Sequence, residues 1–267
     1  MPDASGSVIR RAAAVAYLIL ALARSAAAQE PLAHPPSSRE FLPRYDFLVL
    51  LAGLDINDNR FSWDARAAAD LDVVDYVVGR VSVLAEYEVL MGNEQQLFDP
   101  NQGLYTLEAS SSFRAGPTEF AAVLDHVSRH LSDRANKRGI GMNVVGGRVL
   151  RRVPVGASTL DVRADVGRLI RRSYVDYTWR ARINLVARRP LTSRFGLLGR
   201  AFGETYRVNP TIAGRDGQHG GRLEGGVRIS GRAAALELFA GYERVVDADP
   251  LDRQPRRWAF GGFRVVN

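Results

Sequence analysis

The stretch Leu160-Asp161-Val162-Arg163-Ala164-Asp165-Val166 alternates apolar and charged side chains at every step. Successive side chains of a β-strand point to opposite faces, so the four apolar residues share one face and the three charged residues share the other. Such a strand fits between hydrocarbon on one side and water or ion pairs on the other. The stretch therefore predicts a strand that crosses a lipid membrane as part of a closed barrel.

The same alternation recurs between turn signals along the rest of the chain. Twelve strands are predicted, at 45–54, 60–74, 79–92, 103–115, 118–131, 139–152, 158–171, 176–189, 195–208, 219–230, 233–246 and 256–266. Most of them reach the roughly 9 to 11 residues that a tilted membrane strand requires. The predicted fold is all-β, a single antiparallel transmembrane β-barrel of about 12 strands over residues 44–267.

The connections between the predicted strands alternate in length. Short connections follow even strands, as at 77–80 and 230–233, whereas long ones follow odd strands, as at 92–103 and 208–220. Transmembrane barrels of bacteria have short turns at the periplasmic rim and longer loops outside the cell. With both ends of the barrel in the periplasm, all the long loops are predicted to emerge on the cell exterior.

The first 28 residues have the features of a cleavable secretory signal peptide. Arg10 and Arg11 precede an apolar run over residues 12–23, and the small residues at 26–28 form a cleavage site. The run is shorter than the roughly 20 apolar residues of a membrane-spanning helix, which is the alternative interpretation. Residues 29–43 contain four prolines and are predicted to be an extended periplasmic lead-in.

The composition excludes few classes of function. The chain has no cysteine and a formal charge of +7, and its arginines are spread singly along alternating strands. Nucleic-acid binding is not predicted, because there is no Lys/Arg-rich run or aromatic-stacking motif. No phosphate-cradling loop or dinucleotide motif is present either, so no cofactor is predicted.

The chain resembles the Gram-negative outer-membrane β-barrel class over nearly its whole mature length. The resemblance rests on the signal peptide, the number of strands, the alternation of short and long connections and the closing strand at 258–266. One departure is the end Val265-Val266-Asn267, since many such barrels end on an aromatic residue. The resemblance implies export through the periplasm, residence in the bacterial outer membrane among its lipids, and folding by the barrel assembly machinery. It implies no particular activity and no oligomeric state.

The predicted lumen carries two groups of charges. The acids lie on the second to fourth strands and the arginines on the eighth to tenth, so closure of twelve strands places the groups across the lumen from one another. The residues are Asp64, Asp70, Asp72, Glu86, Glu88 and Glu108, facing Arg180, Arg182, Arg188, Arg200, Arg222 and Arg228. Facing charges can fill and neutralise a structural barrel, or they can line a narrow channel that prefers anions.

A further candidate site lies in Asp125-His126-Val127-Ser128-Arg129-His130-Leu131-Ser132-Asp133. By parity, His126, Ser128 and His130 continue the outward face of the fifth strand near its external end, where polar residues cost little. Asn143 is predicted to face outward on the next strand. A histidine between a serine and an orienting amide is the arrangement that activates a serine nucleophile.

The His-x-Ser triplet resembles outer-membrane phospholipase A and, more loosely, the lipid A deacylases. The resemblance implies that His126 is the base, Ser128 the nucleophile and Asn143 the orienting residue of an acyl-ester hydrolase. Those families place Asn after the serine, whereas this chain has Arg129. The longer element His-x-Ser-x-His-Leu-x-Asp also resembles an uncharacterised bacterial family, which implies no activity.

Two other interpretations of the same segment are available. In a purely structural one, the histidines belong to a hydrated strand end and bind headgroups or loop carboxylates. A metal site would use His126, His130 and Asp133, but the two histidines are about 13 Å apart along a strand, too far to share one ion. The sequence therefore predicts no metal, and it leaves a structural barrel, a channel and a lipid hydrolase as alternatives.

Overall fold

The computed structural model describes residues 30–31, 36–131, 139–209, 215–251 and 253–267. The predicted signal peptide and its cleavage site lie outside the described residues, as does Asp133.

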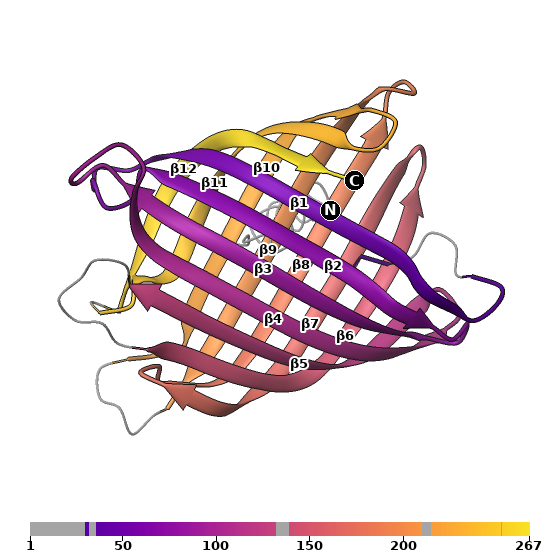
Figure 1. Ribbon diagram of the computed structural model, residues 1–267, viewed down its shortest axis with the longest axis horizontal. Helices are drawn as coiled ribbons and strands as arrows, with labels where there is room; N and C mark the ends of the chain where they lie inside the picture. Colours follow the sequence, from indigo (N-terminus) through magenta and orange to yellow (C-terminus); the bar gives the residue numbers. More distant parts are fainter. Residues whose placement is uncertain (1–29, 32–35, 132–138, 210–214, 252) are drawn as a thin grey trace, which may run out of the picture.

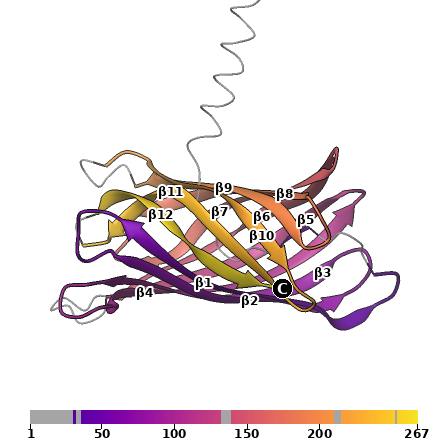
Figure 2. The same ribbon diagram turned by 90° about the horizontal axis from the view of Figure 1, so that it is seen from above.

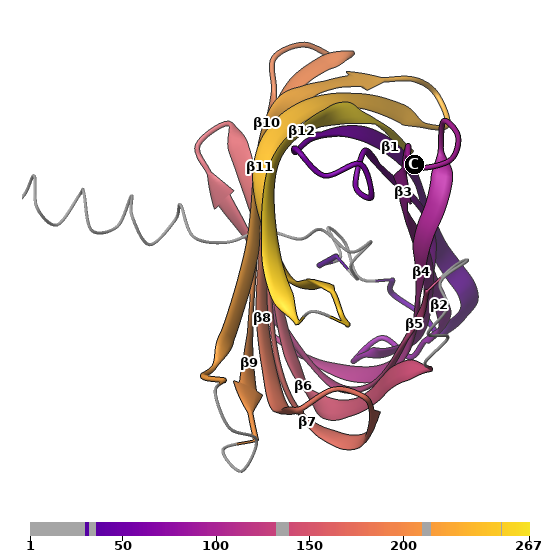
Figure 3. The same cartoon turned by 90° about the vertical axis from the view of Figure 1, so that its left-hand side faces the viewer.

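Twelve antiparallel strands close into one barrel, in which every strand pairs with its neighbours in sequence and β1 pairs with β12 (Figure 1). Seen from its end the barrel is oval in cross-section (Figure 3), and the view from above shows its flattened side (Figure 2). The strands are β1 (Glu40–Asp55), β2 (Trp63–Asp75), β3 (Arg80–Gly92), β4 (Asp99–Ala115), β5 (Thr118–Leu131), β6 (Ile140–Val155), β7 (Ser158–Ser173), β8 (Tyr177–Pro190), β9 (Phe195–Val208), β10 (Gln218–Ser230), β11 (Ala235–Asp249) and β12 (Gln254–Val266). The predicted fold class is confirmed.

The connections that follow the even-numbered strands have two to four residues and lie at one end of the barrel, which we call the periplasmic end. Two-residue turns join β4 to β5 and β6 to β7, and Gly116 and Gly156 adopt positive φ angles of 58° and 60° there. Tight turns between antiparallel strands require positive φ, which glycine adopts without steric cost. The opposite end, which we call the external end, carries the four connections of six to nine residues. It also carries the short β7–β8 and β11–β12 connections, at 174–176 and 250–253, so the predicted alternation in length fails at these two places.

Strand β1 begins at Glu40, five residues before its predicted start and within the predicted lead-in. Glu40 and Phe41 pair with Asp75 and Val74 of β2, and the register then shifts before Arg44. Pro43 lies in this irregularity, where its missing N–H breaks no ladder hydrogen bond. The proline that predicted an extended lead-in is therefore accommodated inside the strand.

The outside of the barrel is apolar and the inside is largely charged. Val49, Leu107, Val166 and Phe263 are among the large apolar side chains exposed on the outer surface, whereas the buried set includes more than twenty charged residues. This distribution is inverted relative to a water-soluble protein, and it is the one expected for a barrel surrounded by lipid. The two different environments on the two faces of each strand explain the alternation of apolar and charged residues in the sequence.

One sector of the lumen is apolar instead of charged. Leu48, Leu50 and Ala52 of β1 point inward and pack with Phe61 and Trp258, whose rings stack at a centroid distance of 5.8 Å. This cluster explains why the first predicted strand is apolar on both of its faces: one face contacts lipid and the other a hydrophobic core. Phe61 comes from the β1–β2 loop, which folds into the lumen.

Candidate functional site

The lumen is crossed by a network of buried ion pairs. Arg148 of β6 donates two hydrogen bonds of 2.6 and 2.5 Å to Glu108 of β4 and one of 2.7 Å to Asp165 of β7. Arg163 of β7 approaches the same two carboxylates at 3.1 and 2.8 Å. These contacts join β4, β6 and β7 at mid-height, where Glu108, Arg148 and Arg163 are buried and the side chain of Asp165 is 10% exposed.

A second network fills the opposite side. Arg264 of β12 contacts both Glu224 and Glu237, and Arg222 of β10 contacts Glu224 at 3.2 Å and reaches Asp64 of β2 at 3.4 Å. The guanidinium of Arg222 also lies 3.8 Å from the ring centroid of Phe260. Cation–π contacts and ion pairs of this kind stabilise charges that have lost their hydration.

All the lumen charges predicted from the sequence lie in the interior. Arg182, Arg188 and Arg228 keep partial exposure, and the buried ones are Asp64, Asp70, Asp72, Glu86, Glu88, Glu108, Arg180, Arg200 and Arg222. The acidic group and the arginine group contact each other directly at some positions, as in the Arg222–Asp64 ion pair. Other members pair with nearby strands, as Asp72 does with Arg80 at 2.9 Å and Arg200 with Glu237 at 3.1 Å.

The external mouth of the lumen is occupied by the end of β11 and the turn that joins it to β12, which bend into the opening in Figure 3. Ala248 is fully buried, and its carbonyl oxygen accepts a hydrogen bond of 2.7 Å from Gln102 of β4. Arg129 donates to the carbonyl oxygen of Asp247 at 2.7 Å, and Arg215 donates to its carboxylate at 2.8 Å. Contacts from β4, β5 and the segment before β10 thus hold the end of β11 inside the barrel.

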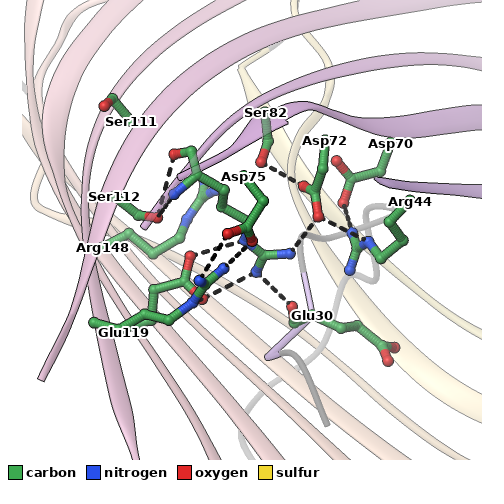
Figure 4. Close-up of polar contacts among 12 residues, drawn as sticks. Glu30, Arg44, Asp70, Asp72, Asp75, Ser82, Ser111, Ser112, Glu119 and Arg148 are labelled. Atoms are coloured by element: carbon green, nitrogen blue, oxygen red, sulfur yellow. Dashed lines mark hydrogen bonds and ion pairs between the residues drawn. The ribbon is translucent and has the colours of Figure 1, made fainter. Parts of the chain in front are cut away.

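The periplasmic mouth contains Glu30, from the segment that precedes β1 (Figure 4). Its backbone carbonyl oxygen accepts a hydrogen bond of 2.8 Å from Arg80, and its carboxylate pairs with Arg188 and lies 3.9 Å from Arg152. Burial alone would raise the pKa of this carboxyl group, but Arg188 and further arginines outweigh it and hold the pKa below its ordinary value. No sequence signal marks Glu30 as a lumen residue.

On the outside of the barrel, the predicted Ser/His/Asn cluster forms two hydrogen-bonded pairs. His126 Nδ1 lies 2.6 Å from Asn143 Oδ1, directly across the β5–β6 ladder. Ser128 Oγ lies 3.1 Å from the Nε2 atom of His130, two residues along β5. Asn143 therefore contacts His126, as the resemblance implies, while the hydrogen-bond partner of Ser128 is His130. The function of His126 as a base stays a prediction.

The cluster lies at the level of an aromatic belt near the external end. Ser128 is opposite Tyr105 of β4, which in turn is opposite Tyr87 of β3, and the two tyrosine rings stack at 4.4 Å. His130 contacts Tyr105 edge-on at a centroid distance of 5.4 Å. Exposed tyrosines on a barrel mark the boundary between hydrocarbon and headgroups. The serine hydroxyl thus lies at the level of this aromatic belt.

A shallow groove on the lipid-facing surface ends at this cluster. Its volume is about 630 Å³, and Ala67, Ala69 and Ala85 form its floor between larger side chains on neighbouring strands. The small alanine side chains create the depression, because Phe47, Val49, Tyr87 and Leu107 stand out around them. His126, Ser128 and His130 line the same groove. An acyl chain in the groove would carry its ester to the serine.

Within the described residues, no three His, Asp or Glu side chains are placed to hold a metal ion. The same part of the chain also contains no helix with the length and hydropathy of a membrane span.

No protein-family model and no curated protein sequence matches this chain. Its structure is similar to "Outer-membrane expressed OmpT of Vibrio cholerae", with 11% identity, a TM-score of 0.44 and coverage of 85% of this chain and 96% of that one. It is also similar to the Acinetobacter baumannii outer membrane protein Omp33, with 9% identity, a TM-score of 0.41 and coverage of 83% and 96%. A third similar structure is the translocator domain of autotransporter NalP from Neisseria meningitidis, with 12% identity, a TM-score of 0.36 and coverage of 98% and 94%.

The closed sheet, the apolar outer surface and the charged interior of this chain are, independently of these likenesses, the properties of a bacterial outer-membrane β-barrel.

Proposed function

We propose that this outer-membrane barrel acts through its lipid-facing surface, as a hydrolase of acyl esters in the outer leaflet. The observation that carries the proposal is the hydrogen bond of 3.1 Å between Ser128 Oγ and His130 Nε2 at the end of an apolar groove. This distance is within the reach that a general base needs to accept the serine proton. The substrate would be a lipid already present in the membrane.

The proposed reaction follows the order of serine hydrolases. Ser128 Oγ attacks the ester carbonyl carbon while its proton moves to the histidine, and the same histidine returns that proton to the leaving alcohol. Water then hydrolyses the acyl-serine and releases the fatty acid. His130 is the partner of Ser128 as it stands, whereas His126, oriented by Asn143, becomes the base if the serine hydroxyl rotates toward it.

Purified protein, refolded in detergent, tests this proposal with phospholipid and lipid A substrates. Ser128→Ala should abolish fatty-acid release and labelling by a fluorophosphonate, whereas Ser111→Ala, an exposed serine on neighbouring β4, should retain both. Loss of the general base should lower the rate by about 100-fold or more. Separate His126→Ala and His130→Ala variants therefore identify the base. Equal release by the wild type and Ser128→Ala would refute the hydrolase and favour a structural barrel.

The lumen, by contrast, is proposed to be a closed scaffold and not a channel. Support comes from the ion pairs at mid-height and from the segments that occupy both mouths. The anion-preferring channel remains the second candidate, because Arg152, Arg188, Arg200 and Arg228 line a hollow of about 350 Å³ at the periplasmic mouth. Planar-bilayer conductance separates the two.

A further inference from the structure

A second hollow on the outer surface, which we call the arginine hollow, lies at the external end of β7 and β8. It has a volume of about 500 Å³, and its lining includes Arg168, Arg171, Arg172, Thr178, Trp179 and Arg207. The proposed hydrolase function does not involve this hollow. Three of its arginines, Arg168, Arg171 and Arg207, share the outer face with the indole ring of Trp179, which is an unusual surface for a part of the barrel that faces lipid.

The hollow exists because two strands separate here. The β7–β8 ladder ends at the pair Arg168–Trp179, although β7 continues to Ser173 in contact with β6. The β6–β7 register also shifts beside Asn143, and the β8–β9 register shifts before Trp179. These irregularities open the sheet surface locally, which an unbroken ladder would not permit.

The strand register places Arg168 and Arg207 on the outer face. Arg168 is opposite both Val145, which is exposed to lipid, and Trp179, which is 44% exposed. Arg207 is the partner of Trp179 on its other side. The intervening residue Arg180 is buried in the lumen, so the alternation of the strand confirms the outward direction.

The charges in the hollow are not neutralised by the described part of the protein. Arg172 donates to the carbonyl oxygen of Tyr177, and no carboxylate within the described residues forms an ion pair with Arg168, Arg171 or Arg207. The lumen arginines differ sharply, since Arg148 and Arg264 each contact two carboxylates. Among the described residues, the cationic cluster at the membrane boundary thus has no carboxylate as a counter-ion, and an anionic lipid headgroup would complement its charge.

We propose that the arginine hollow binds the phosphate groups of a phosphorylated glycolipid of the outer leaflet, of the lipid A class. Guanidinium groups form paired, charge-assisted hydrogen bonds with phosphate oxygens, and several arginines fit a phosphate monoester better than a neutral headgroup. The ring of Trp179 supplies the flat apolar surface against which a sugar packs. This site does not depend on the proposed hydrolase.

The position of the hollow also relates it to the Ser/His/Asn cluster. Arg171 is opposite Asn143 on β6, and Asn143 is opposite His126 on β5, so the three residues form one outward row across adjacent strands. Neighbouring strands are about 5 Å apart, which places Arg171 about 10 Å from His126. If the hydrolase proposal holds, a lipid anchored by its phosphate in the hollow would present its acyl esters toward Ser128.

Native mass spectrometry of the refolded full chain in detergent micelles tests the binding site. The probes are bisphosphorylated lipid A, the same lipid after phosphatase treatment, phosphatidylglycerol and inorganic phosphate. The double variant Arg168→Gln/Arg207→Gln should bind bisphosphorylated lipid A about tenfold or more weakly than the wild type. The matched control is Arg151→Gln/Arg189→Gln, which removes two exposed arginines near the periplasmic end and should bind normally.

Each outcome of this experiment decides the proposal. Tight binding that requires the lipid phosphates and both hollow arginines supports it, as long as heat-modifiable migration shows that the variants are folded. Equal binding of the dephosphorylated lipid overturns the phosphate assignment. Binding of inorganic phosphate alone, or stronger binding of phosphatidylglycerol, overturns the glycolipid assignment. If the control variant Arg151→Gln/Arg189→Gln weakens lipid binding equally, the effect comes from net charge alone, and the arginine hollow is not a specific binding site. None of these readings depends on hydrolysis.

Discussion

Replacing Arg148 with methionine tests whether ion pairs inside the lumen stabilise the barrel. The Arg148 side chain is completely buried and donates three charge-assisted hydrogen bonds, two to Glu108 and one to Asp165. Removing one partner of a buried ion pair costs about 3 to 5 kcal/mol, because an uncompensated charge stays behind. Arg163 still contacts both carboxylates in the variant, so we expect the lower end, about 3 kcal/mol.

The assay is equilibrium unfolding by urea in lipid vesicles, followed by tryptophan fluorescence, with heat-modifiable migration as a second measure of the folded fraction. Arg151→Met is the control, because Arg151 lies on the same strand and is exposed. Its replacement should change the free energy of unfolding by no more than about 0.5 kcal/mol. The double variant Arg148→Met/Glu108→Leu should be less destabilised than Arg148→Met, since it removes both charges of the strongest pair.

The reasoning would be refuted by equal stabilities of the Arg148→Met and Arg151→Met barrels. Such a result would mean that water enters the lumen and solvates the carboxylates, so that the ion pairs exchange with hydration at little cost. The lumen would then resemble a hydrated channel more than a closed interior, and the conductance prediction below would have to be reversed.

Three further predictions concern the two mouths and the apolar sector. Glu30→Gln should lower the free energy of unfolding at neutral pH, where the carboxylate is charged. Because arginines hold the pKa of Glu30 below its ordinary value, its contribution should persist to acidic pH and vanish as the pH falls through that lowered pKa, and a constant difference across this range would contradict the docking. Phe61→Ala should cost about 3 to 5 kcal/mol in urea unfolding, since the ring is buried against Trp258, and a cost under about 1 kcal/mol would place the β1–β2 loop outside the lumen. In planar bilayers the wild type should give no conductance steps, whereas steps whose anion preference falls in Arg180→Ala/Arg182→Ala would establish the channel.

The period-two alternation was sufficient to predict the barrel. A strand with lipid on one face and an ionic interior on the other must alternate residue by residue, so strand number, pairing order and the direction of most side chains follow from local sequence. The exception is β1, where Leu48 and Leu50 meet an apolar sector made by Phe61 and Trp258. That sector is built by a distant strand and a loop, so no local pattern could indicate it.

The outward direction of His126, Ser128 and Asn143 could also be predicted from the sequence. Side chains alternate between the two faces along a strand, and residues paired across neighbouring strands share a face. The same rule, continued two residues beyond Val166, would have placed Arg168 on the lipid face and revealed the arginine hollow. The sequence could not show that Ser128 forms its hydrogen bond with His130 and not with His126. This choice of partner depends on side-chain torsions that both neighbouring strands constrain.

The sequence by itself determined the class of fold and the face on which most strand residues lie, since both follow from a periodicity of two. Only the tertiary structure decided which charges pair, which loop enters the lumen and where strands separate. Arg222 reaches Asp64 from across the barrel, and Glu30 reaches Arg188 from outside the sheet. Such contacts depend on the curvature and closure of the sheet, which bring together residues far apart in the chain, and no local periodicity encodes them.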